Sequence, residues 1–214
     1  KKGPPPSHLT LLAENKEGNA NHVKNIGILA KNQVEAQMKA GKSFSSAYAG
    51  RSTLVKLNDV TNLYLAGVTF RNPANHTVAV AGCTNVTFNG VTLASYNCNN
   101  GDGIEDSHSQ NVTVMNAYFD TGDDCMNYSA GIGAAAAKNT PTAGSWVFDN
   151  YFAHGHGGIV TGSHTGSWIQ DILAEDNVMV GTNIGYRAKT GATVGGGARN
   201  VIFRDSALKN MAEQ

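Results

Sequence analysis

The sequence predicts an all-β fold in which short strands stack, coil upon coil, into a parallel β-helix. Related segments recur: "NLYLAGVTF" begins at Asn62, "NVTFNGVTL" at Asn85 and "NVTVMNAYF" at Asn111, so the starts are 23 and 26 residues apart. Each copy holds two short alternating segments with Asn, Gly or Asp between them. One copy cannot bury its apolar face alone, whereas stacked copies share a continuous core. The unit has no helical period and is too short for a four-stranded propeller blade, so each copy is expected to form one coil.

Weaker copies extend the pattern towards the C-terminus. They read "WVFDNYF" from Trp146, "ILAEDNVMV" from Ile172 and "NVIFRDSAL" from Asn200. Glycine is abundant, with 25 residues, and proline is scarce, with 5, which favours many short strands joined by tight turns. Residues 1–214 are therefore expected to form one β-helix domain.

Two segments interrupt the repeat. In "NIGILAKNQVEAQMKAGKS", Asn25 to Ser43, apolar residues recur at roughly helical spacing among good helix formers, and Gly41 offers a stop. We expect a short helix there, in an excursion outside the coils. The segment "AGIGAAAAKNTPTAG", Ala130 to Gly144, is rich in small residues and is expected to be a long loop beside the cleft.

The charge balance disfavours several classes of partner. Lys+Arg and Asp+Glu number 16 each, so the formal net charge is zero and no global field attracts nucleic acid or an anionic membrane. No apolar run approaches the length of a membrane span. The start, "KKGPPPSHLT", lacks the hydrophobic region of a signal peptide, so we expect a mature form or a fragment.

The three cysteines, Cys83, Cys98 and Cys125, fit no metal-ligand spacing. Buried thiols are expected, because free cysteine is among the most buried residue types. A Cys83–Cys98 disulfide is the alternative.

The stretch "FDTGDDCMNYSAG", Phe119 to Gly131, sets Asp123 beside Asp124. Taken alone, Thr-Gly-Asp-Asp suits a turn. Stacked strands lie about 4.8 Å apart, however, so residues one coil apart in sequence become neighbours. Asp102, in "NNGDGIEDS", precedes the pair by 21 and 22 residues, about one coil. Three carboxylates are therefore expected to cluster on one face.

Later coils add basic side chains to the same ridge. His156, in "AHGHGGIV", follows Asp124 by 32 residues, which is one coil plus the alanine-rich loop. Arg187 and Lys189, in "GYRAKTG", come about 31 residues later and, being two apart on a strand, point the same way. Turn preference does not explain polar groups that fall in phase over four coils, which favours a functional site.

These residue types suit cleavage of a glycosidic bond in a carboxylate-bearing substrate. Glycoside hydrolysis uses two carboxyl groups, one protonated to donate to the leaving oxygen and one ionised. Repulsion within the cluster raises the pKa of at least one member, so a proton can be retained near neutral pH. Arg187 and Lys189 offer a fork and a point charge that suit a substrate carboxylate.

Four segments, "NGDG", "TGDDC", "GHG" and "RAK", resemble in order and spacing the signature of the polygalacturonase family of glycoside hydrolases. The resemblance runs from about Arg51 to Asn210. It implies a right-handed, single-stranded parallel β-helix, a pectin-lyase-like solenoid, that hydrolyses the α-1,4 bonds of polygalacturonate in pectin with inversion. The stretch "GIVTGSHTGSWIQDILAEDNVMVGTNIGYRAKT" is most similar to bacterial exo-acting members, which trim from the non-reducing end. Exo action is therefore expected over endo action.

The resemblance implies a catalytic role for four residues. Asp123 would be the general acid, while Asp102 and Asp124 would hold and deprotonate the attacking water. His156 would sit beside the acid and tune its protonation. Because an inverting pair of carboxyl groups lies about 6.5–9.5 Å apart, we expect such a gap between Asp123 and the other two aspartates.

Substrate-binding residues follow in the same way. Arg187 and Lys189 would bind the galacturonate carboxylate at the cleavage point. Asn100, in the first segment, is a further substrate-binding candidate. His164 either lines the cleft and contacts substrate or caps a turn, and neither is favoured.

The sequence departs from the family pattern in three places. "NGD" replaces the usual Asn-Thr-Asp and "RAK" the usual Arg-Ile-Lys, and both keep the chemical residues. The chain stops at "NMAEQ", whereas family members continue for further coils that carry a substrate-contacting tyrosine. We expect the β-helix to be incomplete at one or both ends.

Five further residues are assigned to structure. His108, Glu105 and Asp106 follow the first segment closely and suit turns and strand ends better than catalysis. Trp146 and Trp168 occupy repeat positions, so core packing is expected for both rather than a sugar platform, with Trp168 left open because it follows the cleft loop.

Other functions remain possible. A pectate lyase, another β-helix class that acts on the same polymer, would use acidic residues for calcium and Arg187 as a base, whereas His156 and Lys189 favour hydrolysis. A non-catalytic β-helix, such as a carbohydrate-binding or adhesin segment, would show no turnover. A sister hydrolase acting on rhamnogalacturonan is disfavoured, because the Arg–Lys pair and His156 fit a uronate.

The family also sets expectations for partners and location. We expect a monomer that acts on polygalacturonate and oligogalacturonates, without a cofactor or a metal ion and without a nucleic-acid or membrane partner. The expected location is secreted or periplasmic, with the signal peptide outside this chain.

Overall fold

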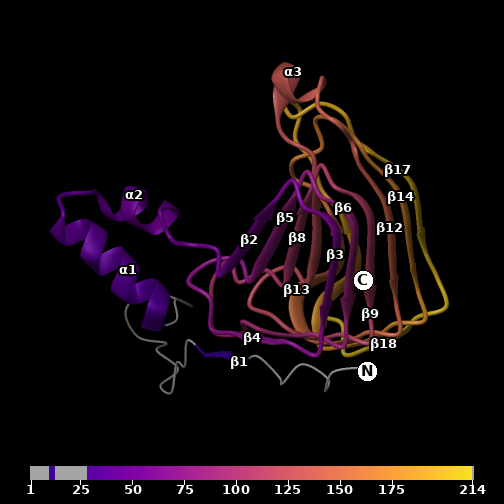
Figure 1. The fold of residues 1–214 in the computed structure, drawn as a ribbon, viewed down its shortest axis with the longest axis horizontal. Coiled ribbons are helices and arrows are strands. Elements are labelled where there is room, and N and C mark those ends of the chain that lie inside the picture. Colours follow the sequence, from indigo (N-terminus) through magenta and orange to yellow (C-terminus); the bar gives the residue numbers. More distant parts are fainter. Residues whose placement is uncertain (1–9, 13–27, 214) are drawn as a thin grey trace, which may run out of the picture.

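The computed structural model describes residues 10–12 and 28–213 of the chain. Within them, about six coils stack into a right-handed parallel β-helix, which confirms the predicted fold class (Figure 1). Residues 1–9, 13–27 and 214 lie outside the described part. Most of "KKGPPPSHLT" and residues 25–27 of the expected helix fall among them.

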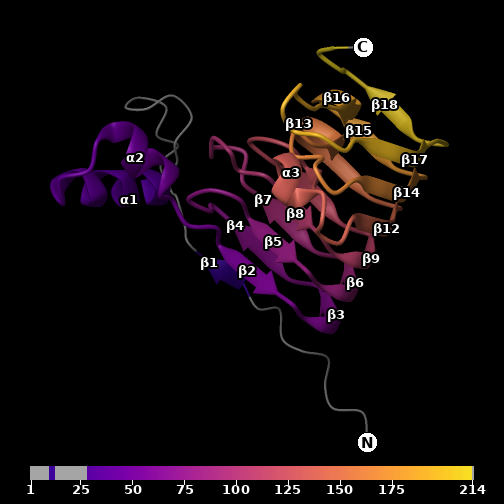
Figure 2. The same cartoon turned by 90° about the horizontal axis from the view of Figure 1, so that it is seen from above.

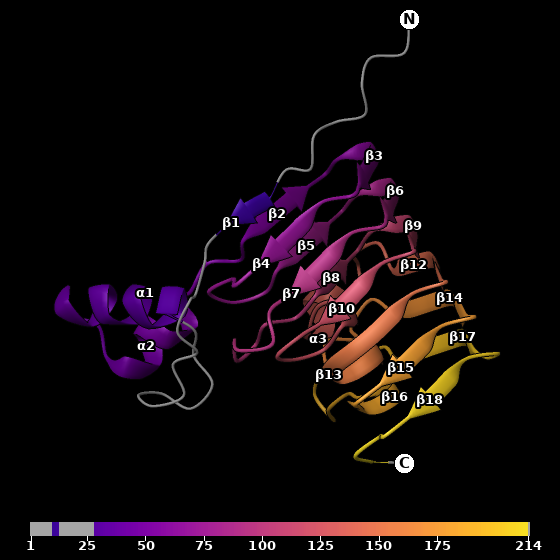
Figure 3. The same cartoon turned by 90° about the horizontal axis from the view of Figure 1, so that it is seen from below.

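Each coil contributes one strand to each of three sheets, and the paired strands are parallel. Sheet A comprises β1 (Thr10–Leu12), β4 (Thr69–Arg71), β7 (Thr92–Ala94), β10 (Tyr118–Asp120), the first part of β13 (Tyr151–Thr161), β15 (Val178–Val180) and β18 (Ala207–Lys209). Sheet B comprises β2 (Val55–Asn58), β5 (Val78–Ala81), β8 (Ile104–Ser107), β11 (Met126–Ser129), the second part of β13 and β16 (Thr182–Ala188). Sheet C comprises β3 (Thr61–Ala66), β6 (Thr84–Asn89), β9 (Gln110–Met115), β12 (Thr142–Phe148), β14 (Ile169–Glu175) and β17 (Ala198–Phe203). The coils follow one another along the helix axis from β3 to β18 (Figure 3).

The recurrent asparagine that opens the clear copies has a conformational cause. Asn62, Asn85 and Asn111 have φ of 61°, 56° and 58°, in the left-handed region that asparagine tolerates better than most residues. Their side-chain amides form a ladder, with Asn85 Nδ2 donating to Asn62 Oδ1 at 3.0 Å and Asn111 Nδ2 to Asn85 Oδ1 at 3.1 Å. At the next coil the position is Gly144, with φ 73°. The repeat therefore marks a fixed bend at the start of sheet C.

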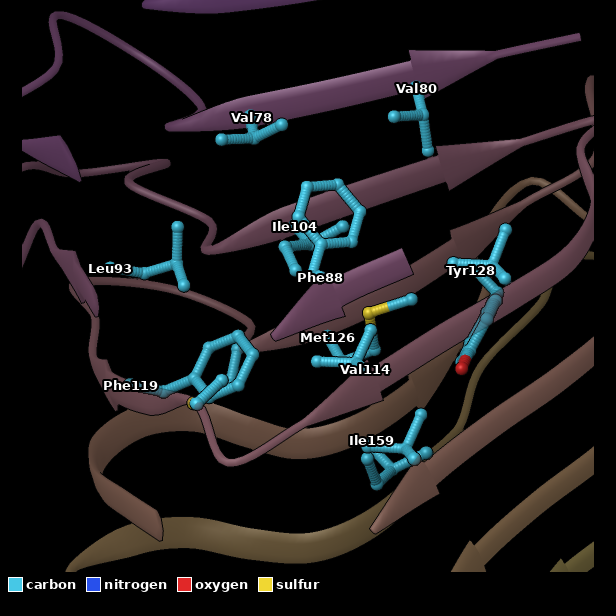
Figure 4. Packing of buried hydrophobic residues seen from close by; sticks show 14 of the residues in the cluster. Val78, Val80, Phe88, Leu93, Ile104, Val114, Phe119, Met126, Tyr128 and Ile159 are labelled. Carbon is cyan, nitrogen blue, oxygen red and sulfur yellow. The ribbon is translucent and has the colours of Figure 1, made fainter. Parts of the chain in front are cut away.

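Alternate residues of each strand point inward and stack on their equivalents in the neighbouring coils, as the side chains in Figure 4 illustrate. Phe119 and Phe152, adjacent in register on β10 and β13, stack with ring centroids 4.7 Å apart. Complete burial of such side chains contributes roughly 1.5–3 kcal/mol each. This shared core joins the coils.

Strand β13 continues from sheet A into sheet B, through a corner at which other coils have two separate strands. The first part of β13 pairs with β10 and β15, and its second part with β11 and β16. Close packing at this corner requires glycine, because a Cβ added to Gly155 would lie 2.3 Å from Cys125 Sγ. The corner carries His156.

The segment expected to be helical forms one helix, as predicted, and a second helix follows directly after it; both lie beside the coil stack (Figures 1 and 2). Helix α1 spans Ile28–Lys39, and α2 spans Phe44–Ala49. Gly41, just after α1, has φ of 89°. The excursion is thus longer than one helix, because Ser43 caps a second one through its side chain.

The alanine-rich segment also contains regular structure. Helix α3 spans Gly133–Ala136, and β12 begins at Thr142. Lys138, Asn139 and Thr140 line a hollow of about 710 Å³ that also borders β5 and β9, away from the aspartate cluster.

The prediction that both tryptophans pack in the core is wrong. Trp146 is 45% exposed and Trp168 39% exposed. Trp146 occupies an outward position of β12, stacks on Phe148 and donates Nε1 to Glu175 Oε1 at 3.0 Å. Trp168 lies under the Arg199 guanidinium, 4.8 Å from the ring centroid. For Trp146 the repeat predicts the strand but not which face of the sheet the side chain occupies, which a shift of one residue reverses. Trp168 lies just before β14, with φ of 76°.

Cys83, Cys98 and Cys125 are buried thiols, as predicted, and the alternative Cys83–Cys98 disulfide is not formed. In the described part of the chain, no helix is long and apolar enough to cross a membrane.

Candidate active site

The polar residues singled out from the sequence converge where sheets A and B meet. Strand register brings them together: the Gly103 amide donates to the Asp124 carbonyl at 2.9 Å, and the His156 amide donates to the Asp123 carbonyl at 2.9 Å. One cavity of about 210 Å³ is lined by six of the eight residues predicted for the site, namely Asn100, Asp102, Asp123, Asp124, His164 and Lys189. The other two residues lie beside the cavity: His156 contacts Asp123, and Arg187 contacts His156.

Asp123 and Asp124 differ in their surroundings although they are neighbours. The Asp123 carboxylate is partly exposed, and its Oδ1 accepts a hydrogen bond from the Asp124 amide at 2.9 Å. Its Oδ2 accepts a long bond, 3.4 Å, from Asn100 Nδ2. Asp124 is only 1% exposed and points into the cavity. The pair is therefore more than a solvated turn.

Lys189 neutralises Asp124. Its Nζ lies 2.6 Å from Asp124 Oδ2, while Asp124 Oδ1 is buried without a hydrogen-bond partner. Burial raises the pKa of Asp124, and the hydrogen bond and charge of Lys189 oppose that rise. An oxygen held in this way is suited to accept a hydrogen bond from a water molecule or a ligand.

His156 connects Asp123 to Arg187. Arg187 Nη1 lies 2.8 Å from His156 Nε2, and His156 Nδ1 lies 3.5 Å from Asp123 Oδ1. A guanidinium can only donate, so Nε2 accepts and the ring proton is assigned to Nδ1, which faces the carboxylate. Arg187 thereby orients His156.

The two basic residues do not form one separate anion site, although they lie in phase. Lys189 follows β16 and turns to Asp124, whereas Arg187, within β16, reaches His156. Both cations therefore contact members of the catalytic candidates directly.

Sequence reasoning missed part of the cavity lining. His76, Glu105, Asn127 and Ser129 also line it. Their position follows from register, because Asn127 pairs with Glu105 across β11 and β8. His76 precedes Asp102 by 26 residues, the same offset that pairs β5 with β8, and this coil spacing could have identified it.

The expectation that Glu105 and Asp106 serve turns or strand ends is wrong, because both lie within β8. Glu105 faces the cavity, where Asn127 Nδ2 donates to its Oε2 at 2.7 Å. Asp106 points to the core and is 1% exposed. His108 does occupy a turn, with φ of 56°, and its Nδ1 lies 2.8 Å from the Thr140 carbonyl oxygen.

The buried carboxyl groups of the cavity have raised pKa values. Burial raises the pKa of Asp102 well above its ordinary value, and the negative charges of Asp123 and Glu105 raise it further. Burial also raises the pKa of Glu105 to about 7, against the hydrogen bond from Asn127. Burial lowers the pKa of His76. The cavity can therefore hold neutral acids beside ionised ones near neutral pH.

Within the part of the chain that the structure describes, two groups of three side chains place potential metal-ligand atoms within 4.8 Å of one another. They are His76, Asp102 and Glu105, and Asp123, Asp124 and His156. In the first group, His76 turns Nδ1 towards Glu105 and Nε2 towards Asp102, at 3.8 and 4.0 Å, so one ion could not use both contacts.

Residues 19–214 match the glycosyl hydrolases family 28. The chain belongs to this family. This family match confirms the resemblance based on the four signature segments, and it favours a hydrolase over a lyase.

Similar proteins are named as enzymes of the same kind. Over 193 residues the chain is 50% identical to an exo-poly-alpha-D-galacturonosidase of Dickeya chrysanthemi, covering 90% of this chain and 32% of that protein. It is 52% identical to a Yersinia enterocolitica family 28 exopolygalacturonase of known structure, with a TM-score of 0.85, covering 93% of this chain and 35% of that one. An exopolygalacturonase from Thermotoga maritima, 24% identical with a TM-score of 0.72 over 85% of this chain and 42% of that one, shares the fold. The chain spans about a third of the length of the two more similar relatives.

Proposed function

We propose that this chain carries the catalytic centre of a hydrolase that cleaves the α-1,4 bonds of polygalacturonate with inversion, releasing product from the non-reducing end. The observation that carries the proposal is a partly exposed carboxylate, Asp123, beside the buried and cation-paired Asp124, in one polar cavity with Asp102. The exo mode rests on the relatives, because two proteins at 50% and 52% identity are named for exo action.

Asp123 is proposed as the general acid. It is the more accessible member of the adjacent pair, and His156 Nδ1 and Asn100 Nδ2 both approach it. A carboxylic acid at the cavity surface can reach a glycosidic oxygen, which a buried one cannot. His156, oriented by Arg187, would return the proton to the acid or stabilise its carboxylate after donation.

Asp124 and Asp102 are proposed to hold the attacking water, and Asp124, paired with Lys189, is proposed to take its proton. Asp124 keeps Oδ1 without a protein partner while Lys189 holds Oδ2, so the unpartnered oxygen can accept from water. Inversion requires a gap of about 6.5–9.5 Å between the acid and the base carboxyl groups. Carboxylate oxygens of Asp123 and Asp124 lie within 4.8 Å of one another, so this pair does not show the expected gap.

The substrate is proposed to bind through its carboxylate. Arg187 and Lys189 supply cationic charge at the edge of an otherwise acidic cavity, and Asn100 and His164 line it as polar contacts. A galacturonate carboxylate at the cleavage point would compete with Asp124 and His156 for these cations. A neutral sugar would lack that attraction.

The proposed setting is outside the cytoplasm, secreted or periplasmic, because polygalacturonate is a cell-wall polymer. We propose a monomer without a nucleic-acid or membrane partner. The zero net charge supports the absence of a nucleic-acid partner.

The proposal is tested by digesting polygalacturonate with the full-length protein and its Asp123→Asn variant. Reducing ends, absorbance of unsaturated product and product size are followed over time. Asp120→Asn is the matched control, because Asp120 lies outside the cavity lining and pairs with His154.

New reducing ends without unsaturation, lost in Asp123→Asn and retained in the control, are expected. Early release of mono- or digalacturonate alone would support exo action. Unsaturated product would identify a lyase. A folded full-length protein with no turnover on polygalacturonate would refute the proposal and favour a binding segment.

A further inference from the structure

The Asn100 side chain is held between the helical excursion and Asp123. Its Oδ1 accepts from Arg51 Nη2 at 2.8 Å and from the Tyr48 hydroxyl at 3.3 Å. Its Nδ2 then faces Asp123 Oδ2 at 3.4 Å. The two ends of an amide differ only in hydrogen-bonding character, so the donors on Oδ1 fix which end turns to the carboxylate.

Arg51 makes this arrangement rigid. The residue is 7% exposed, and its guanidinium donates to the carbonyl oxygens of Tyr48, Ala74 and Asn99 at 2.8, 3.1 and 2.7 Å. It also lies over the Tyr48 ring, 3.8 Å from the centroid. No carboxylate of the described residues lies within 4.0 Å of it. A buried cation with neutral partners is costly, which argues for a role beyond packing.

Helix α1 holds the segment that carries Arg51. The Ser52 amide donates to Gln33 Oε1 at 2.9 Å, and Gln33 Nε2 donates to the Ser52 hydroxyl at 3.2 Å. Gln37 Nε2 donates to the Gly50 carbonyl at 3.0 Å. Both neighbours of Arg51 are thus hydrogen-bonded to α1, so the position of the helix determines where the guanidinium lies.

We propose that Arg51, with Tyr48, is a positioning residue that orients the Asn100 amide towards Asp123. The inference rests on the proposed function, in which Asp123 is the acid. It gives the α1–α2 excursion a role in catalysis without any contact with substrate. It also makes Asn100 an orienting residue for the acid as well as part of the cavity lining.

A purely structural role for Arg51 predicts a different outcome. Loss of a loop contact lowers stability, whereas loss of acid positioning lowers kcat with little change in KM. Arg51→Lys separates the two, because lysine keeps the charge but cannot reproduce the fork that spans four acceptors, Asn100 Oδ1 among them.

The experiment compares Arg51→Lys with wild type in the full-length protein, by steady-state kinetics on oligogalacturonate and by crystal structures of both. Arg199→Lys is the matched control: Arg199 donates Nε and Nη2 to Gln170 Oε1 at 2.9 and 2.6 Å and lies over Trp168, but on sheet C. Tyr48→Phe is a second variant that removes one donor and leaves the ring beneath the guanidinium.

Arg51→Lys is expected to lower kcat about tenfold or more while KM stays within about twofold, because small displacements of a catalytic group cost this much. Its crystal structure should show the Asn100 amide turned from Asp123 in an otherwise unchanged fold. Tyr48→Phe should act in the same direction, more weakly, and Arg199→Lys should match wild type.

Unchanged kcat, or an Asn100 amide still facing Asp123 in Arg51→Lys, would overturn the inference. If Arg51→Lys fails to fold, Tyr48→Phe decides by the same two criteria. If wild type does not hydrolyse the substrate, the proposed function fails, and the crystal structures still decide whether Arg51 orients Asn100.

Discussion

Lys189 Nζ lies 2.6 Å from Asp124 Oδ2, a contact between residues 65 positions apart. The aspartate is 1% exposed, whereas the lysine side chain is 26% exposed. The ion pair therefore contacts solvent on the lysine side, while the carboxylate is buried. This one contact serves both the stability of the site and the ionisation of the carboxylate proposed to hold water.

Lys189→Met is expected to destabilise the fold, because it leaves a buried carboxylate without its cation. Fully buried pairs cost more, but Lys189 is partly exposed, so we expect about 1–3 kcal/mol. The double variant Lys189→Met/Asp124→Asn should regain most of that loss. Urea unfolding of wild type, Lys189→Met, Asp124→Asn and the double variant measures this coupling, and equal stability of wild type and Lys189→Met would contradict the prediction.

Asp106 should make the fold less stable as pH rises. Burial raises the pKa of Asp106 to about 7, against the opposing effect of the Ser109 hydroxyl and amide, and both carboxylate oxygens are buried. The unfolded chain has the lower pKa, so the folded state holds the proton more tightly. The contribution is fully present below about pH 4 and is lost as pH rises to about 7, with an upper limit near 4 kcal/mol.

Asp106→Asn should remove this dependence and be more stable than wild type at about pH 8. Asp149→Asn is the control, because Asp149 is an exposed turn residue. Urea midpoints near pH 5 and pH 8 test the difference between the variants. A wild-type protein that gains stability between these values relative to Asp106→Asn would show that the sign is wrong.

Glu105 should weaken substrate binding above neutral pH. With a pKa raised to about 7 by burial, it is neutral in mild acid and adds a negative charge to the cavity as pH rises. An anionic substrate is then repelled, so KM should rise roughly three- to tenfold from about pH 6 to 8. Glu105→Gln should blunt this rise, whereas Glu35→Gln, on exposed α1, should not. A KM profile identical in wild type and Glu105→Gln counts against the assignment.

Gly122, which precedes the aspartate pair, has no room for a side chain. An added Cβ would lie 2.1 Å from the Cys98 carbonyl oxygen and 2.8 Å from that of Ser95. Gly122→Ala should therefore cost about 1–3 kcal/mol and displace Asp123, lowering kcat. Gly191→Ala, whose Cβ would meet only Val194 Cγ2 at 3.5 Å, should be nearly neutral. Thermal unfolding compares them, and equal melting temperatures would refute the steric argument.

The coil repeat made much of the fold and site predictable. Asn62, Asn85 and Asn111 mark equivalent positions because each adopts a left-handed conformation that most residues avoid. Once the coil length is known, Asp102 falls beside Asp124 by spacing alone. Local sequence therefore encodes the register, and register encodes the site.

What the sequence did not reveal depends on three-dimensional context. The outward position of Trp146 follows from which face of β12 meets the core, and Asp106 is directed inward on β8 by the same alternation, whereas Trp168 lies just before β14 with φ of 76°. Arg51 gave no local signal, because its partners on Ala74 and Asn99 lie 23 and 48 residues away. Such contacts appear only when the coils and the excursion are assembled.

In the proposed inverting mechanism, water attacks from the side of Asp102 and Asp124 while Asp123 protonates the leaving oxygen. Proton NMR of the galacturonate released by the full-length protein in the first minutes, before mutarotation, tests it most directly. Inversion predicts that the β-anomer appears first from the α-linked polymer, because the configuration of the anomeric carbon is exchanged. Initial release of the α-anomer would contradict it, since retention requires a carboxylate to act as nucleophile.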